Sequence, residues 1–108
     1  MKKYHFVLIP LFLLVTTVMA STLNNVDRYI GYTIFATKTI AGYQERDGKK
    51  GTDFQGCDFG RVIIFDDNTI LHCGGYGYQY AYRPDALILV KGTSFKMIVE
   101  NNEYDMQR

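Results

Sequence analysis

Short runs of β-forming residues, separated by clusters of turn-forming residues, recur along most of this chain. The runs are YIGYTIFATKTIAGYQ, RVIIF, ILHC, YGYQYAY, ALILV, FKMIV and EYDM, at residues 29–44, 61–65, 70–73, 76–82, 86–90, 95–99 and 103–106. Outside the N-terminal region, no window sustains the 3.6-residue period of an amphipathic helix. Such a series of short strands predicts an all-β fold, a small antiparallel meander that forms a barrel or a sandwich.

Three of the connections have the composition of tight hairpins, namely DDNT at 66–69, KGTS at 91–94 and ENNE at 100–103. Treated as four-residue loops, the second places Val90 opposite Phe95 and the third places Val99 opposite Tyr104. The two-residue period of a strand then collects one predicted core face. Its members are Ile88, Val90, Phe95, Met97, Val99, Tyr104 and Met106. Residues 46–60, rich in glycine and charge, are interpreted as a long surface loop pinned by Cys57.

The first 20 residues have the three parts of a secretory signal peptide. Lys2 and Lys3 precede an apolar run over residues 6–15, and Val18-Met19-Ala20 supplies a small-residue cleavage site. We expect a signal peptide at 1–20 and a single small β domain at 21–108, with one short N-terminal helix allowed by the spacing in STLNNVDRYI. The apolar run is shorter than the roughly 20 residues that span a bilayer, so no stable membrane anchor is expected after cleavage.

Charge and cysteine content narrow the class of protein. Lys2 and Lys3 leave with the signal, so ten of the 12 basic residues remain against 11 acidic ones, a net charge of −1. A near-neutral chain lacks the basic stripe of nucleic-acid binding proteins, which excludes that partner class. Export to an oxidising compartment, secreted or periplasmic, predicts a disulfide between Cys57 and Cys73. Free buried thiols and intermolecular pairing remain as alternatives.

A row of four tyrosines, Tyr76, Tyr78, Tyr80 and Tyr82, occupies every second position of GGYGYQYAYR. If the segment pairs with ALILV through RPDA as a four-residue loop, the rings share a partly open face and form an amphipathic platform. A three-residue loop instead turns the rings toward the core face. Both interpretations stay open: cross-strand aromatic packing, or a binding surface of tyrosines followed by Arg83.

Catalytic chemistry has little support in the sequence. His72 is the only histidine after the signal, and its neighbour Cys73 points to the opposite face of a strand, which argues against a Cys–His nucleophile pair. The aspartates match no calcium-loop spacing, and one histidine with two bridged cysteines makes a closed zinc site improbable. We therefore predict no catalytic residues, no metal site and no cofactor.

Two functional hypotheses follow from these observations. The preferred one is a non-enzymatic binding or interaction module that contacts a protein or glycan of the cell envelope or extracellular space. The alternative is a small hydrolase, or an inhibitor of a secreted enzyme. An exposed tyrosine row would favour binding, whereas a cleft converging on Asp58, Arg61 and His72 would favour chemistry.

Overall fold

The computed structural model describes residues 26–108, so the predicted signal peptide and its cleavage site lie outside the described residues. The chain divides into one unit that ends at Gly31 and a second that runs from Tyr32 to Arg108. In the first unit, the described end of the predicted N-terminal helix forms a single 3-10 turn, η2 (Asp27–Tyr29). None of the helical structure within residues 26–108 has the length and apolar character needed to cross a membrane.

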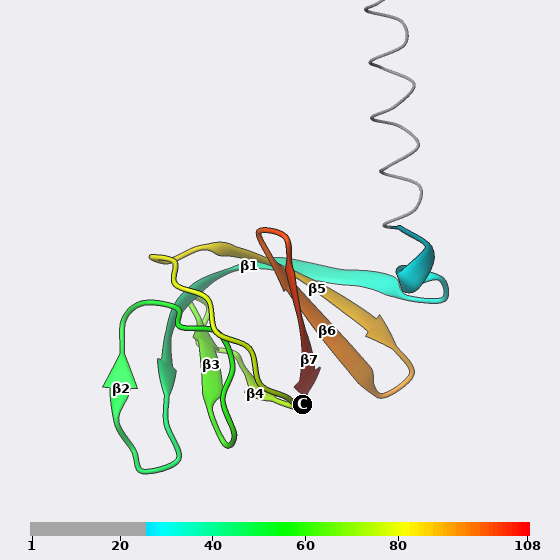
Figure 1. Ribbon diagram of the computed structural model, residues 1–108. Helices are drawn as coiled ribbons and strands as arrows, with labels where there is room; N and C mark the ends of the chain where they lie inside the picture. Colours follow the sequence, from blue (N-terminus) through cyan, green and yellow to red (C-terminus); the bar gives the residue numbers. More distant parts are fainter. Residues whose placement is uncertain (1–25) are drawn as a thin grey trace, which may run out of the picture. The chain divides into compact units, whose positions relative to one another are not determined.

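Tyr32 to Arg108 form a closed antiparallel β-barrel of six strands with one extra strand (Figure 1). The strands are β1 (Thr33–Gln44), β2 (Lys50–Gly51), β3 (Val62–Phe65), β4 (Ile70–Cys73), β5 (Asp85–Lys91), β6 (Ser94–Val99) and β7 (Asn102–Gln107). Their order is β2-β1-β3-β4-β7-β6-β5, and the barrel closes because β5 also pairs with β1. The predicted all-β antiparallel class is therefore confirmed, as a barrel.

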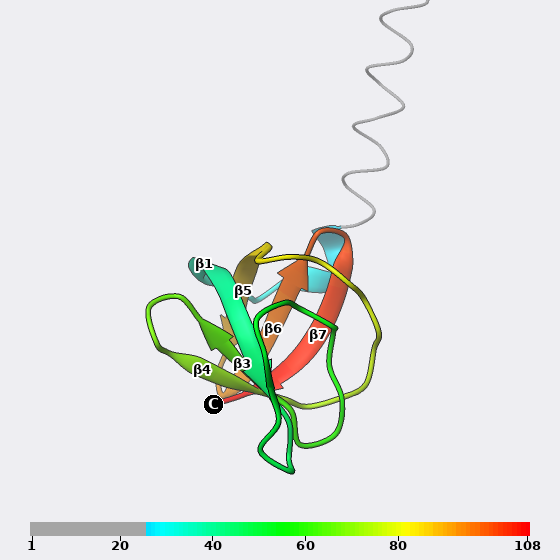
Figure 2. The same ribbon diagram turned by 90° about the vertical axis from the view of Figure 1, so that its left-hand side faces the viewer.

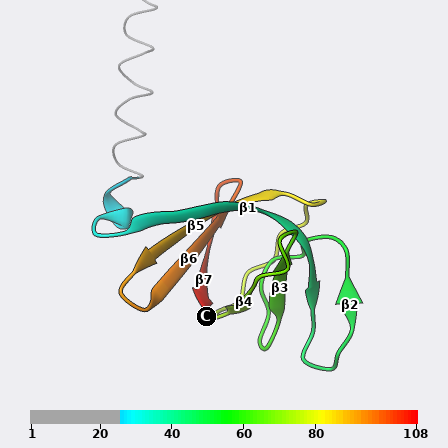
Figure 3. The ribbon, with the colours of Figure 1, turned by 180° about the vertical axis from the view of Figure 1, so that it is seen from behind.

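Strand β1 closes the barrel because it pairs with two different strands along its length. Its first part, from Thr33 to Thr39, pairs with β5, and its second part, from Ile40 to Gln44, pairs with β3. Register shifts at two points interrupt these ladders, and such irregularities bend a strand. Figure 3 shows the resulting curve of β1 from β5 toward β3 and β2. At Gly42 a Cβ atom would lie 2.1 Å from the carbonyl oxygen of Gly51, so the approach of β2 requires glycine.

The predicted hairpin registers hold in part. Val90 pairs with Phe95 across KGTS, as expected. Across ENNE, however, Val99 pairs with Asn102 and Met97 pairs with Tyr104, two residues away from the prediction. The turn is tighter than assumed because Glu100 adopts a left-handed conformation with φ of 57°, which allows a two-residue connection.

The predicted core face survives the register error, because a shift of two residues keeps every side chain on its side of the sheet. Six of its seven members are buried and Val90 is partly buried. The other strands and the segment before Cys57 add Ile40, Phe54, Ile63, Phe65 and Leu71 to the same cluster.

The predicted pairing of the tyrosine segment with ALILV is wrong. Both edges of β5 are occupied, one by β6 and the other by β1. The tyrosine segment instead makes two isolated bridges to the chain before the first cysteine, Phe54 with Ala81 and Cys57 with Gly77. The 12-residue strand β1 gives β5 a longer partner than the tyrosine segment would. In addition, Arg83 has a φ of 47°, which turns the chain between the tyrosine segment and β5.

The interpretation of residues 46–60 as a surface loop is also wrong in part. The segment contains β2, and its Phe54 and Cys57 side chains are buried in the barrel core. The disulfide prediction is confirmed: Cys57 and Cys73 are bridged, with their Cα atoms 5.5 Å apart. The segment is thus pinned by Cys57 as expected, but it packs against the barrel core instead of projecting from the surface as a loop.

Candidate functional site: an exposed tyrosine row

The four tyrosine rings project into solvent, which rules out the core-packing interpretation. We call Tyr76, Tyr78, Tyr80 and Tyr82 the tyrosine row; they are 79%, 71%, 59% and 70% exposed. The residues between them face the other way, with Gly77 and Ala81 half-buried and Gln79 only 8% exposed. In Figure 2 the row lies on the yellow stretch of chain that arches along one side of the barrel between β4 and β5.

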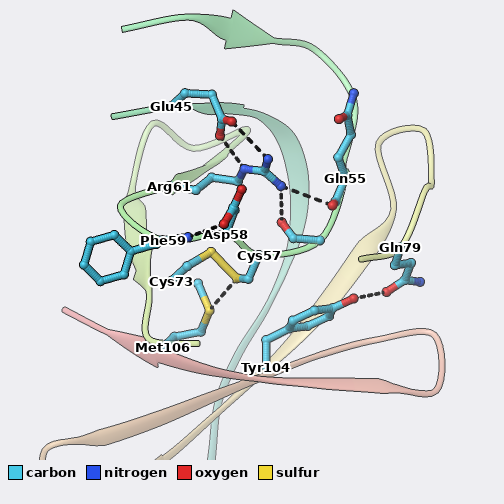
Figure 4. Close-up of a disulfide and its surroundings, with 11 residues drawn as sticks. Glu45, Gln55, Cys57, Asp58, Phe59, Arg61, Cys73, Gln79, Tyr104 and Met106 are labelled. Atoms are coloured by element: carbon cyan, nitrogen blue, oxygen red, sulfur yellow. Dashed lines mark hydrogen bonds and ion pairs between the residues drawn. A yellow bond between two sulfur atoms is a disulfide. The ribbon is translucent and has the colours of Figure 1, made fainter. Parts of the chain in front are cut away.

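Gln79 anchors the middle of the tyrosine row to the barrel. The Tyr104 hydroxyl donates a 2.7 Å hydrogen bond to Gln79 Oε1 (Figure 4). Gln79 Nε2 in turn donates to the Glu100 carboxylate at 2.6 Å. The ring of Tyr104 packs edge-on against Phe54, with centroids 5.5 Å apart. Burial raises the pKa of the Tyr104 hydroxyl, so it remains a protonated donor at neutral pH.

Backbone bonds and the disulfide brace the ends of the same segment. Phe54 and Ala81 exchange two hydrogen bonds, as do Cys57 and Gly77, at 2.8 to 3.0 Å. Gly56 allows this close approach, because a Cβ atom there would lie 2.0 Å from the carbonyl oxygen of Gly77. The bridge to Cys73 then ties residues 54–57 to the end of β4. The rings are therefore displayed from a restrained backbone.

Arg61 fixes the chain around the first cysteine rather than facing a substrate. Its guanidinium binds both carboxylate oxygens of Glu45 and donates to the carbonyls of Gln55 and Gly56 at 3.1 Å each (Figure 4). The hydrogen bond with Glu45 raises the pKa of the Arg61 guanidinium. With these donors occupied and the side chain buried, Arg61 is a structural residue.

A hollow of about 400 Å³ adjoins the Tyr76 end of the row. We call it the Phe59 groove; its lining includes Arg46, Phe59, Gly60, His72, Gly75 and Tyr76. The guanidinium of Arg46 stacks over the exposed ring of Phe59, 4.4 Å from the centroid. Within residues 26–108, Arg46 forms no salt bridge, and neither does Arg83 at the other end of the row.

The residues that would have indicated catalysis do not converge. Asp58 accepts a hydrogen bond from the backbone N–H of Phe59 and Arg61 is committed to Glu45, so only His72 of the three lines the groove. Among the described residues there is no group of three or more His, Cys, Asp or Glu side chains placed to hold a metal ion. The arrangement offers aromatic and cationic contacts rather than a nucleophile with a base.

A second cavity is lined by residues of β1, β3, β4, β5 and β6 and by none of the tyrosine row. It measures about 170 Å³; six of its nine lining residues are apolar, and the polar ones are Lys38, Thr69 and Arg108. Lys38 is already paired with Asp67 at 2.8 Å. Lys38 also donates to the Thr69 hydroxyl, so both of these polar groups are already engaged. We assign the candidate site to the row, because its four rings are exposed together.

Comparison of the chain with protein-family models, with curated proteins and with solved structures found no match. The site therefore has to be argued from its own residues. Sequence reasoning selected the tyrosines, Arg83 and both cysteines, but it missed Arg46, Phe59 and Gln79. The first two lie in the segment interpreted as a loop, and a signal for Gln79 did exist, since it alternates with the tyrosines.

Proposed function

We propose that this chain is an exported, non-enzymatic binding or interaction module of the cell envelope or extracellular space. Its contact surface is the tyrosine row together with Arg83, and its partner is a protein or glycan. The observation that carries the proposal is the exposure of all four rings on a segment held by Gln79 and the disulfide. Tyrosine supplies large contact area at low entropic cost, and a pre-ordered display lowers the cost of binding.

Export is part of the proposal, and the disulfide supports it. Disulfides persist mainly in oxidising compartments, and small exported domains use them to supplement a limited core. The Cys57–Cys73 bridge also holds residues 54–57, the neighbours of the row. The disulfide therefore supports the proposed export, and it also holds the segment on which the tyrosine row rests. The hydrolase alternative finds no support in the placement of Asp58, Arg61 and His72.

The test compares retention of envelope fractions by the immobilised protein. A detergent-solubilised envelope protein fraction and a purified cell-wall polysaccharide are each passed over the wild type, Tyr80→Ala and Ile34→Ala. Ile34 is a matched control because it is an exposed apolar residue on β1, outside the row. We expect one fraction to be retained by the wild type and by Ile34→Ala, with at least about tenfold less on Tyr80→Ala. Equal retention by all three proteins would refute the row as the contact surface.

A further inference from the structure

The tyrosine row lies on a backbone with one paired edge and one open edge. Gly77 and Ala81 direct their N–H and C=O groups to residues 54–57. In an extended chain, successive residues direct these groups to opposite edges, so those of Tyr78 and Tyr80 point away from residues 54–57. Within the described residues, no hydrogen bond involves the backbone of Tyr78 or Tyr80. The row therefore borders a backbone edge that is open at Tyr78 and Tyr80.

An open edge of this kind selects a polypeptide over a glycan. Its donors and acceptors repeat at the spacing of a β-strand, about 3.3 Å per residue, and an extended peptide presents the complementary groups at the same spacing. Side chains of an added strand opposite Tyr78 and Tyr80 would lie on the face of the rings, about 5 Å away between Cβ atoms. The tyrosines would then act as cross-strand partners and would choose alternate residues of the peptide.

Charge at the two ends of the row indicates which peptide fits. Arg46 lies in the Phe59 groove beside Tyr76, and Arg83 follows Tyr82. Neither guanidinium has a carboxylate partner among residues 26–108. The row from Tyr76 to Tyr82 spans about 20 Å when extended, so acidic residues about eight positions apart would reach both arginines. A second copy paired antiparallel through the same edge would instead bring Arg83 toward the Arg46 end of its partner, which like-charge repulsion disfavours.

We propose that the open edge at Tyr78 and Tyr80 binds an extended peptide segment of another protein by strand addition, with acidic residues at both ends of the segment. This inference rests on the proposed function and narrows its partner to a polypeptide. Backbone pairing provides the affinity, the rings select alternate side chains, and Arg46 and Arg83 set the position of the peptide along the edge.

The decisive experiment blocks the edge without altering any side chain. Chemical ligation at Cys73 joins residues 21–72 to a synthetic 73–108 segment in which Tyr80 carries a backbone N-methyl group. The matched control carries the N-methyl group at Gly92, in the turn between β5 and β6 and outside both the row and the Phe59 groove, where even an added Cβ would meet nothing within 4 Å. A random nine-residue peptide library is first selected on the wild-type protein, and the dissociation constant of the enriched peptide is then measured for all three proteins.

We expect enriched peptides to have acidic residues near both ends, and the N-methyl group at Tyr80 to weaken binding by at least about tenfold. The Gly92 control should stay within about twofold of wild type, with unchanged thermal melting. Arg46→Gln combined with Arg83→Gln should weaken binding by about threefold to tenfold at low salt and remove the preference for acidic ends.

Four outcomes would overturn the inference. One is the absence of any enriched peptide, and another is equal binding by the protein methylated at Tyr80. A third is a dimer in sedimentation that disappears on methylation at Tyr80, which would make a second copy the occupant. If oligosaccharides of an acidic uronate polymer bind and are unaffected by the methyl group but lost in Tyr80→Ala, the peptide inference fails while the proposed function survives.

Discussion

The rings of Tyr78 and Tyr80 are exposed to solvent. Truncating either side chain should therefore weaken binding without destabilising the fold. We predict that Tyr→Ala changes at each of the four row positions lower the free energy of unfolding by less than about 1 kcal/mol. Phe54→Ala, at a fully buried ring on the neighbouring segment, should cost about 3–5 kcal/mol. Urea denaturation of the five variants measures both effects. A loss above about 2 kcal/mol at Tyr78 or Tyr80 would mean that the ring is packed after all.

Tyr104 provides a second prediction at this scale, because one atom of its side chain anchors the row. Tyr104→Phe keeps the ring on Phe54 but leaves Gln79 Oε1 without its donor. We expect a loss of about 1–2 kcal/mol in unfolding free energy and faster amide hydrogen exchange at Gly77 and Ala81. Tyr43→Phe is the control, because it changes a tyrosine that packs against the same core without bonding Gln79. Exchange rates that stay unchanged in Tyr104→Phe would show that Gln79 does not hold the segment.

At the level of strands, a pairing across a short turn was predictable from the sequence where the turn residues fix the turn geometry. The hairpin KGTS placed Val90 opposite Phe95 because its glycine, Gly92, readily adopts the left-handed conformation that this tight turn requires. The register across ENNE was missed by two residues because composition does not reveal that Glu100 takes a left-handed conformation. The partner of the tyrosine segment was missed for a different reason: contacts between residues 54–57 and 77–81 are non-local, and no period in either run encodes them.

The effect of removing the disulfide on the stability of the fold can also be predicted. Replacing Cys57 and Cys73 by Ser removes a link across 16 positions, and the chain-entropy model values such a loop at about 3 kcal/mol. Cys57 is also buried against Met106, so the Ser variant places a hydroxyl in an apolar site. We expect a loss of at least about 3 kcal/mol in denaturant unfolding, and exposure of the row segment to proteolysis. A Cys57→Ala and Cys73→Ala pair separates the link from the hydroxyl. Retention of wild-type stability by the Ala pair would contradict a stabilising bridge.

For the molecule as a whole, the residues of the candidate site were easier to select from the sequence than their arrangement in space. The tyrosines were selected by their alternation and Arg83 because it follows them. The exposure of the rings, however, depended on which segment packs against the opposite side of their backbone. The Phe59 groove had no local signal, because Arg46 and Phe59 are 13 positions apart in a glycine-rich segment. They meet only because Arg61 and the disulfide fold that segment against β1 and β4. A site made by such restraints is a property of the tertiary structure.

The last prediction links export to the oxidised fold. If residues 1–20 are a signal peptide, the exported protein begins at Ser21, and its bridge forms only after transfer to an oxidising compartment. Intact-mass analysis of the secreted or periplasmic fraction should show loss of 20 residues and a mass two hydrogens below that of the dithiol. The control deletes residues 2–20, which should leave the protein in the cytoplasm with Cys57 and Cys73 open to alkylation. A mature fraction that keeps Ala20, or a cytoplasmic control that is fully bridged, would break the link between export and this fold.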